Sequence, residues 1–350
     1  MNIGYTVQKC DATMPDRINN VRIIKNMHLK VLTCFCFFWV SIASPAQTKK
    51  AAVIFDSDMG PDYDDVGAIA LLHAFADSGK IEILATMAST QYNCVACVLD
   101  VFNTYFKKPE IPVGVPKRKA LILRDWQHWS DTLVTNYPHK IKNNNEAEDA
   151  VELYRKVLSK QASHSVIIVT VGFLTNLSDL LQSKADKYSS LDGKSLVAQK
   201  VKQLVCMAGK FPEGYEFNID KDIPASQYVY ANWPTNILFS GFEIGMKIKT
   251  GLPLIRNLKI INSPVKDVFR ISIPMSKEDS AGRMSWDETA VLVAVKGFAP
   301  FYTLQYGHIE IADDGKNNWV KEGSGQAYLI ESLPPAEVQA LINSMIMHQP

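Results

Sequence analysis

The sequence predicts a single large α/β domain with a doubly wound, mostly parallel central sheet. Three observations lead to this prediction. The chain has 350 residues, 47% of them hydrophobic, which is enough to bury a sizeable core. From residue 51 onwards, strand-like apolar runs alternate with segments of helical spacing. The first apolar run is continuous rather than alternating, which is typical of a parallel strand covered on both faces.

The first strand and helix show the pattern most clearly. Residues 51–56 (AAVIFD) form the continuous apolar run. The next segment has apolar residues at Val66, Ile69 and Leu72 and stops at Gly79, as an amphipathic helix does. The later elements are expected at 81–89 (strand), 94–106 (helix), 111–115 (strand), 146–160 (helix), 165–171 (strand), 177–183 (helix), 201–209 (strand), 224–240 (helix and strand), 285–298 (helix) and 302–311 (strand).

This order of elements indicates βαβ units, which place their strands in one parallel sheet. Residues 116–145 interrupt it, because they are aromatic and polar with little periodicity. We expect a long loop there, and loops of that length in compact domains are usually functional or disordered.

The N-terminus has the features of a signal peptide. Residues 31–44 form an apolar run that is too short to span a bilayer, and small residues follow it up to Ala46. Met27 stands where such a peptide would start. We therefore expect residues 1–26 to be a mis-assigned upstream extension, 27–46 a signal peptide and 47–350 the mature, exported domain, periplasmic or secreted. An uncleaved membrane anchor or a buried strand is the alternative.

The charge balance favours a small-molecule partner. The formal net charge is +1, and the longest basic runs have only two or three residues. A nucleic-acid-binding protein would show a larger basic patch. We expect no nucleic-acid partner and no membrane association after signal cleavage, and a homo-oligomer stays open.

Three cysteines remain in the mature chain, and two of them form a Cys94-x-x-Cys97 pair. Such spacing occurs in redox and zinc sites, but no second pair or nearby histidine completes a metal site. One helical turn apart in an apolar segment, the two side chains are expected to pack on the core face of the second helix.

An acidic cluster follows the first strand. Five carboxylates occur within ten residues: Asp56, Asp58, Asp62, Asp64 and Asp65. They lie where the strand ends and the helix begins, and in open α/β sheets ligands bind at this edge. So many carboxylates repel one another unless a cation neutralises them, and Ca²⁺ prefers all-oxygen sites of this kind. Helix capping explains one or two of the aspartates. From the Asp-x-Asp motif alone, a phosphatase of the haloacid dehalogenase type also remains open.

Further motifs follow in order along the chain. They are Gly172-Phe173-Leu174-Thr175-Asn176, Met207-Ala208-Gly209, Glu216-Phe217-Asn218 and Trp286-Asp287. Together with the acidic cluster, they resemble the inosine–uridine nucleoside hydrolase family over about residues 51–330. The acidic stretch differs from the family's Asp-x-Asp-Pro-Gly-x-Asp-Asp by two extra residues before the Asp pair. Four ordered motifs are more specific than any one of them, and they exclude the phosphatase interpretation.

The resemblance implies a nucleoside hydrolase-like fold and a role for each matching residue. It implies Ca²⁺ as cofactor, held by Asp58, Asp65, Asp287 and the main-chain carbonyl of Val171. Asp58 would also be the catalytic base toward the attacking water. Ribose binding would involve Asp64 and Asn218 at the hydroxyls, Glu216 at the 5′-hydroxyl, and Asn93 as a further contact.

Two departures from the family pattern concern the leaving group. The family's His before the last Asp is Trp286, and its Asn before Glu-Phe-Asn has no counterpart in residues 210–215. A Trp cannot act as a general acid at neutral pH, although it can stack on a base and so bind substrate. Replacement acids are sought in the 116–145 loop, where Asp125, His128 and His139 are the candidates.

The sequence therefore predicts a calcium-dependent hydrolase that cleaves the N-glycosidic bond of a ribonucleoside or related ribosyl compound by water attack at the anomeric carbon. Such an activity fits purine or pyrimidine salvage. One alternative is a non-catalytic ribosyl-ligand-binding protein with a degenerate hydrolase site. Another is the same calcium site serving a different glycoside.

Overall fold

The computed structural model describes residues 50–350. The predicted upstream extension and signal peptide, residues 1–46, lie outside the described residues. Across the described part of the chain, no helix combines the length and apolar character that a membrane crossing requires.

Within residues 50–350, eleven strands form one sheet in the order β4-β3-β2-β1-β5-β6-β8-β13-β11-β12-β7. The seven strands from β4 to β8 are parallel to their neighbours, while β11, β12 and β7 pair antiparallel. The strand bounds are β1 Ala51–Ser57, β2 Ile81–Ala88, β3 Val113–Val115, β4 Glu148–Asp149, β5 Val166–Thr170, β6 Val201–Met207, β7 Glu213–Gly214, β8 Asn236–Ser240, β11 Tyr302–Ile311, β12 Asn317–Val320 and β13 Gln326–Glu331. The predicted mostly parallel sheet is thus confirmed.

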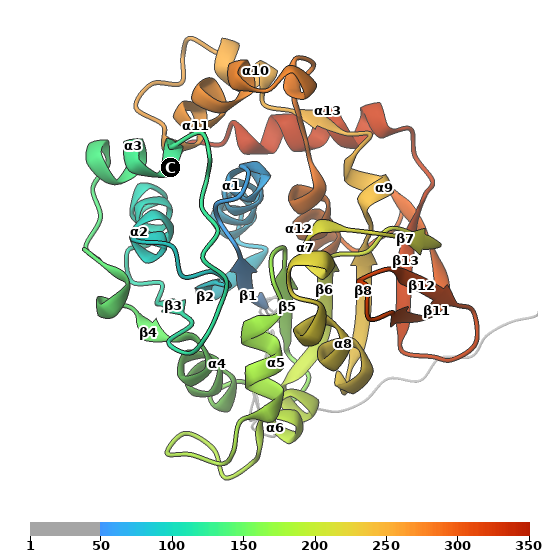
Figure 1. The fold of residues 1–350 in the computed structure, drawn as a ribbon. Coiled ribbons are helices and arrows are strands. Elements are labelled where there is room, and N and C mark those ends of the chain that lie inside the picture. The colour runs from blue at the N-terminus through green and yellow to red at the C-terminus, as the bar shows by residue number, and fades with distance from the viewer. Residues whose placement is uncertain (1–49) are drawn as a thin grey trace, which may run out of the picture. The chain divides into compact units, whose positions relative to one another are not determined.

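The sheet is doubly wound about β1. From β1 the chain adds β2, β3 and β4 on one side and then returns to add β5, β6 and β8 on the other, as Figure 1 shows. Strand order therefore reverses between β1 and β5. At such a point the loops that leave the two strands diverge and open a crevice at the carboxyl edge of the sheet.

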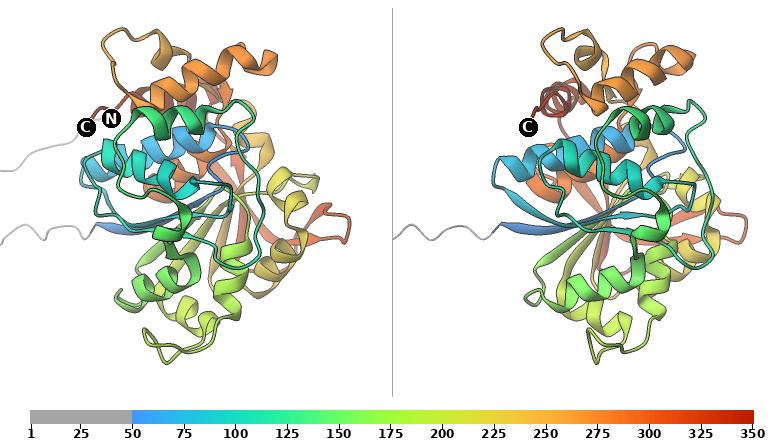
Figure 2. Two further views of the ribbon diagram at one scale, coloured as in Figure 1. Left: turned by 60° about the vertical axis from the view of Figure 1, so that its left-hand side comes forward. Right: turned by 90° about the vertical axis from the view of Figure 1, so that its left-hand side faces the viewer.

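Helices cover both faces of the sheet (Figure 2). One face packs against α1, α2 and α12 with α3, α10, α11 and α13 outside them, and the other packs against α4, α5, α6 and α8. The helix bounds are α1 Asp64–Asp77, α2 Val95–Tyr105, α3 Trp129–Asn136, α4 Ala150–Ser159, α5 Thr175–Gln182, α6 Gly193–Lys200, α7 Phe217–Lys221, α8 Ile223–Asn232, α9 Phe242–Gly245, α10 Leu252–Arg256, α11 Pro264–Ser272, α12 Trp286–Lys296 and α13 Pro335–Ile346. A second, two-stranded sheet pairs β9 (Lys249–Thr250) with β10 (Arg283–Met284).

The continuous apolar run of β1 reflects burial on both faces. Ala52 and Ile54 belong to the core shared with α4 and α5, whereas Val53 and Phe55 belong to the core shared with α1 and α12. Successive side chains of a strand point to opposite faces, so a central strand needs apolar residues at every position.

The 116–145 segment differs from the expected loop because it contains the helix α3. Trp129 and Leu133 are fully buried, one turn apart, against α2 and α11. Their spacing is that of a short amphipathic helix, which the surrounding polar residues conceal in the sequence.

Cys94 and Cys97 are joined by a disulfide and do not pack as separate side chains. Cys94 precedes α2 with a left-handed backbone (φ 65°), and the two Cα atoms are 5.0 Å apart, within the range that a disulfide spans. Cys97 is buried in the core as expected, whereas Cys94 is only partly buried, and the disulfide was not predicted from the sequence.

Candidate active site

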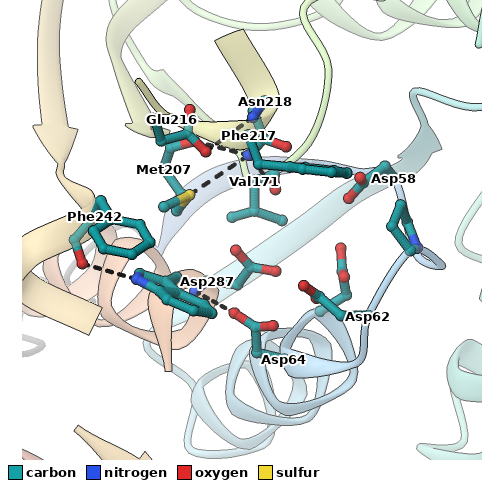
Figure 3. Close-up of a pocket in the computed structure, with 13 residues that line it drawn as sticks. Asp58, Asp62, Asp64, Val171, Met207, Glu216, Phe217, Asn218, Phe242 and Asp287 are labelled. Atoms are coloured by element: carbon teal, nitrogen blue, oxygen red, sulfur yellow. Dashed lines mark hydrogen bonds between the residues drawn. The ribbon is translucent and has the colours of Figure 1, made fainter. Parts of the chain in front are cut away.

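A pocket of about 540 Å³, open mouth included, lies at the carboxyl ends of β1, β5, β6 and β8. This is the crevice where the strand order reverses, and the volume is in the range of small-molecule sites. The lining residues are Asp58, Pro61, Asp62, Asp64, Asp65, Val171, Met207, Glu216, Phe217, Asn218, Phe242, Trp286 and Asp287. Every residue that the sequence assigned to the metal or the substrate is among them except Asn93. Figure 3 shows their side chains around the pocket.

The acidic loop between β1 and α1 forms one wall. Asp65 is held by the Ser57 hydroxyl, which donates to its Oδ1 at 2.6 Å, and by the Met59 amide at 3.1 Å. The buried Tyr92 donates its hydroxyl to the Met59 carbonyl at 2.7 Å and so braces the turn. These contacts fix the loop before any ligand is present.

The loop after β5 approaches Asp58 closely at Gly172. A Cβ added there would lie 2.4 Å from the Asp58 backbone nitrogen. Only glycine allows this approach, which brings the Val171 main chain and Asp58 to the same pocket.

Asp56 does not belong to the site, although it is one of the five clustered carboxylates. It points to the opposite face of the sheet, where the Tyr154 hydroxyl donates to Oδ2 at 2.8 Å and Asn176 Nδ2 at 3.1 Å. Burial raises its pKa to about 7, against the lowering effect of these two donors. Asp56 is therefore a structural tie between β1, α4 and α5, and four of the five carboxylates reach the pocket.

The four pocket carboxylates of the acidic loop and Asp287 influence one another strongly. Burial, and after it the charges of Asp65 and Asp62, raises the pKa of Asp58 well above its usual value. Burial and the charges of Asp64 and Asp65, among others, do the same to Asp287. The pKa of Asp65 rises to about 6 for similar reasons. Such a group of negative charges is stabilised by a cation.

The donor set fits a hard cation. Asp58, Asp65 and Asp287 would supply carboxylate oxygens, and the main-chain carbonyl of Val171, another residue that lines the pocket, would supply a further oxygen. Oxygen-only sets of this kind suit Ca²⁺. Within residues 50–350, however, no group of three or more Asp, Glu, His or Cys side chains is already arranged around a metal-sized position.

The opposite wall comes from the loop after β6 and from α7. The carboxylate of Glu216 caps α7 and accepts the amides of Asn218 at 2.9 Å, Ile219 at 3.2 Å and Gly209 at 3.2 Å. Burial raises its pKa to about 7 in spite of these donors. Asn218 donates through Nδ2 to the carbonyls of Val171 and Met207, each at 3.2 Å. Both side chains are thereby held in fixed orientations at the pocket.

The start of α12 brings Trp286 and Asp287 to the third wall. Trp286 donates its Nε1 hydrogen to the Phe242 carbonyl at 2.8 Å and stacks on the Phe242 ring, with centroids 5.2 Å apart. Phe217, the exposed first residue of α7, lines the pocket from the wall of Glu216 and Asn218. A planar base would find apolar ring surfaces here.

The sequence reasoning missed Arg283, three residues before Trp286. This buried side chain donates through Nε at 3.0 Å and Nη2 at 2.8 Å to Asp64 Oδ1, and it pairs with Asp62 as well. Its partners lie more than 200 residues away in sequence, so only the fold reveals the contact. The sequence did hold one signal: Arg283 stands just before the apolar helix α12, and an arginine that is buried there needs a negatively charged partner.

Four predicted residues lie outside the pocket. Asn93 is exposed, and its side chain does not reach the lining. Asp125 is buried but accepts from the Ser130 amide and hydroxyl, while His128 is exposed beside Asp131 and His139 donates its Nδ1 hydrogen to the Tyr137 carbonyl. The 116–145 segment thus places no acid at the pocket in this structure.

Comparison with known proteins agrees with this geometry. The model of the inosine-uridine preferring nucleoside hydrolase family matches residues 53–331. Solved structures with the same fold include a plant nucleoside hydrolase, the PpNRh1 enzyme, with a TM-score of 0.66 and 19% identity over 85% of this chain and 99% of that one. An inosine-uridine preferring nucleoside hydrolase from Bacillus anthracis has a TM-score of 0.65 and 15% identity over 85% and 99%. The type III effector XopQ, complexed with adenosine diphosphate ribose, has a TM-score of 0.64 and 14% identity over 86% and 94%. No curated protein matches the chain.

Proposed function

Because the chain belongs to the inosine-uridine preferring nucleoside hydrolase family, a family of N-ribohydrolases, we propose that its pocket cleaves the N-glycosidic bond of a ribonucleoside or a related ribosyl compound with the help of Ca²⁺. The observation that carries the proposal is the convergence of Asp58, Asp65, Asp287 and Val171 on one pocket at the point where strand order reverses. The donors that these four residues would offer to an ion are all oxygens.

Asp58 is the proposed base. Its carboxylate takes a proton from the attacking water, the water oxygen forms a bond to the anomeric carbon, and the electron pair of the broken C–N bond goes to the leaving nitrogen. When bound, Ca²⁺ would hold this water and lower its pKa. The carboxylates around the sugar favour the positive charge that develops on it in the transition state.

The polar residues of the remaining walls are proposed to hold the sugar. Asp64 and Asn218 would bind the ribose hydroxyls and Glu216 the 5′-hydroxyl. Glu216 and Asn218 are oriented by backbone contacts before any ligand binds, which reduces the entropy lost on binding. Asn93 is dropped from this set because it does not reach the pocket.

A binding protein without turnover is the second candidate, and the leaving-group side supports it. Trp286 replaces the expected acid, its Nε1 hydrogen already serves the Phe242 carbonyl, and no histidine among residues 50–350 lines the pocket. One solved structure of the same fold is the effector XopQ complexed with adenosine diphosphate ribose. The two phosphates of such a ligand would, however, be repelled in this pocket, because it is lined by six carboxylates and by no Lys or Arg. Hydrolysis of an uncharged nucleoside is therefore the preferred candidate.

Release of reducing sugar from a panel of nucleosides tests the proposal. Purified protein with Ca²⁺ should release ribose from at least one nucleoside, and chelation by EGTA should stop it. Asp58→Asn should bind the same nucleoside without releasing sugar. Binding of a nucleoside by the wild-type protein without sugar release would instead support the binding protein.

We further propose that the mature chain begins after Ala46 and is exported, as the N-terminal pattern indicates. Sequencing the N-terminus of the native protein tests this. A mature chain that begins at Met1 would contradict it.

A further inference from the structure

Arg283 is a buried cation that joins three parts of the site without lining the pocket. It lies on β10, is 8% exposed, and contacts three carboxylates. Besides Asp64 and Asp62, it lies 3.8 Å from Asp279, to which Tyr63 donates its hydroxyl at 2.8 Å. The acidic loop, β10 and the 3₁₀ helix at Lys277–Asp279 thus meet at one guanidinium.

Two aromatic rings fix the guanidinium further. Its central carbon lies 5.1 Å from the centroid of the Tyr63 ring and 5.0 Å from that of the Trp286 ring. Arginine stacks on aromatic faces and presents its donors as a planar fork, so its orientation is set by rings and carboxylates together.

One short stretch supplies most of these contacts. Between Gly60 and Asp64, both Asp62 and Tyr63 contact Arg283. This stretch and the arginine therefore form one structural unit.

Both oxygens of Asp64 are held by this unit and by the start of α12. Oδ1 accepts both Nε and Nη2 of Arg283, and Oδ2 accepts the Asp287 amide at 3.3 Å. The plane of the carboxylate is thus fixed at the edge of the pocket that Asp64 lines (Figure 3). Without the cation, the neighbouring charges of Asp62 and Asp64 would repel each other and turn the side chains apart.

We propose that Arg283 is a positioning residue that aims Asp64 at the sugar and thereby sets a preference for ribosyl compounds with both vicinal hydroxyls. The inference rests on the proposed function, because it takes Asp64 as the ribose contact. A carboxylate bound to a sugar hydroxyl contributes discrimination on the order of 10- to 100-fold against a sugar that lacks it. A carboxylate free to rotate contributes much less.

The test compares Arg283→Lys with Arg155→Lys. Arg155 is an equally buried arginine on α4, 2% exposed, whose guanidinium binds Ser183, Asp186 and the carbonyls of Ser189 and Leu191, away from the pocket. Each lysine keeps the charge and loses the planar fork, so both variants should unfold at a lower temperature. The measured quantity is kcat/KM for inosine divided by that for 2′-deoxyinosine and for 3′-deoxyinosine, with kcat and KM determined separately.

Arg283→Lys should lower at least one of these ratios about tenfold or more, chiefly through a higher KM for inosine, and Arg155→Lys should leave both ratios at the wild-type value. A wild-type ratio in Arg283→Lys overturns the inference, and so does an equal loss in Arg155→Lys. If the wild-type protein releases no sugar, the same ratios are measured as dissociation constants by calorimetry. Loss of the preference there supports the inference while the proposed hydrolysis fails, and absence of any binding overturns both.

Discussion

Asp56 and Asp58 provide a sharp test, because they are two residues apart and have opposite roles. Asp58 lines the pocket, whereas Asp56 is buried on the other face of the sheet. We expect Asp58→Asn to abolish turnover without loss of stability and Asp56→Asn to lower stability. An aspartate-to-asparagine change keeps the shape and removes the charge, so the two variants differ only in what the charge does.

The contacts of each residue set the magnitudes. At position 56, Tyr154 and Asn176 both donate to the carboxylate, and the amide of an asparagine would turn a donor toward one of them. A buried donor left without an acceptor costs about 1–3 kcal/mol. At position 58, removing one of several neighbouring negative charges relieves repulsion in the metal-free protein, so the free energy of unfolding should stay equal or rise. Loss of a general base costs roughly 10²–10⁴-fold in rate.

Denaturant unfolding without metal and sugar release with Ca²⁺ measure the two effects on the same preparations. Asp56→Asn should unfold at a lower denaturant concentration and keep measurable turnover in its folded fraction. Asp58→Asn should show the wild-type midpoint or a higher one, with no sugar released. Turnover by Asp58→Asn within tenfold of wild type would refute its role as base. A clear loss of stability in that variant would refute the electrostatic reasoning.

Four more predictions concern the metal, the pocket walls and the corrected residue. Ca²⁺ at a hundred times its dissociation constant should raise the unfolding free energy by about 2.7 kcal/mol, and Asp287→Asn should lose this gain in a thermal shift assay. Burial raises the pKa of Glu216 to about 7, so its stabilising contribution is present at pH 4 and lost as pH rises through 7; between pH 4 and 8 the free energy of unfolding of metal-free Glu216→Gln should therefore fall by up to about 3 kcal/mol less than that of the wild type, on top of a pH-independent cost for the Gln amide that faces backbone N–H groups. Gly172→Ala should cost about 1–3 kcal/mol and slow sugar release, because its Cβ would displace Asp58; unchanged kinetics would refute the tight approach. Asn93→Ala should leave kcat/KM unchanged, because Asn93 lies outside the pocket. A large loss of kcat/KM in this variant would show that Asn93 contacts the substrate after all.

The fold was predictable because its strands are buried on both faces. A run such as 51–55 is apolar at every position only when helices cover both sides, and this single fact indicates a parallel sheet. The short elements were not predictable. The helix α3 has only Trp129 and Leu133 to mark its buried side, and α10 has five residues, too few for a period to be visible.

For the site, too, residues that lie close together in sequence were predictable, whereas residues that meet only through long-range contacts were not. Asp58, Asp64 and Asp65 could be predicted because one short loop carries them at the edge of a parallel strand. Asp56 lies just before that loop, in β1, and only the alternation of the strand decides that it faces Tyr154 instead of the pocket. Arg283 needs the whole fold, since its contacts to Asp64 span 219 residues. One segment of the sequence thus contains most of the acidic residues of the pocket. The cation that orients them, Arg283, is found only from the contact between β10 and α1 in the folded chain. If that cation sets sugar preference, substrate choice in this chain depends on the part of the site that its motifs do not contain.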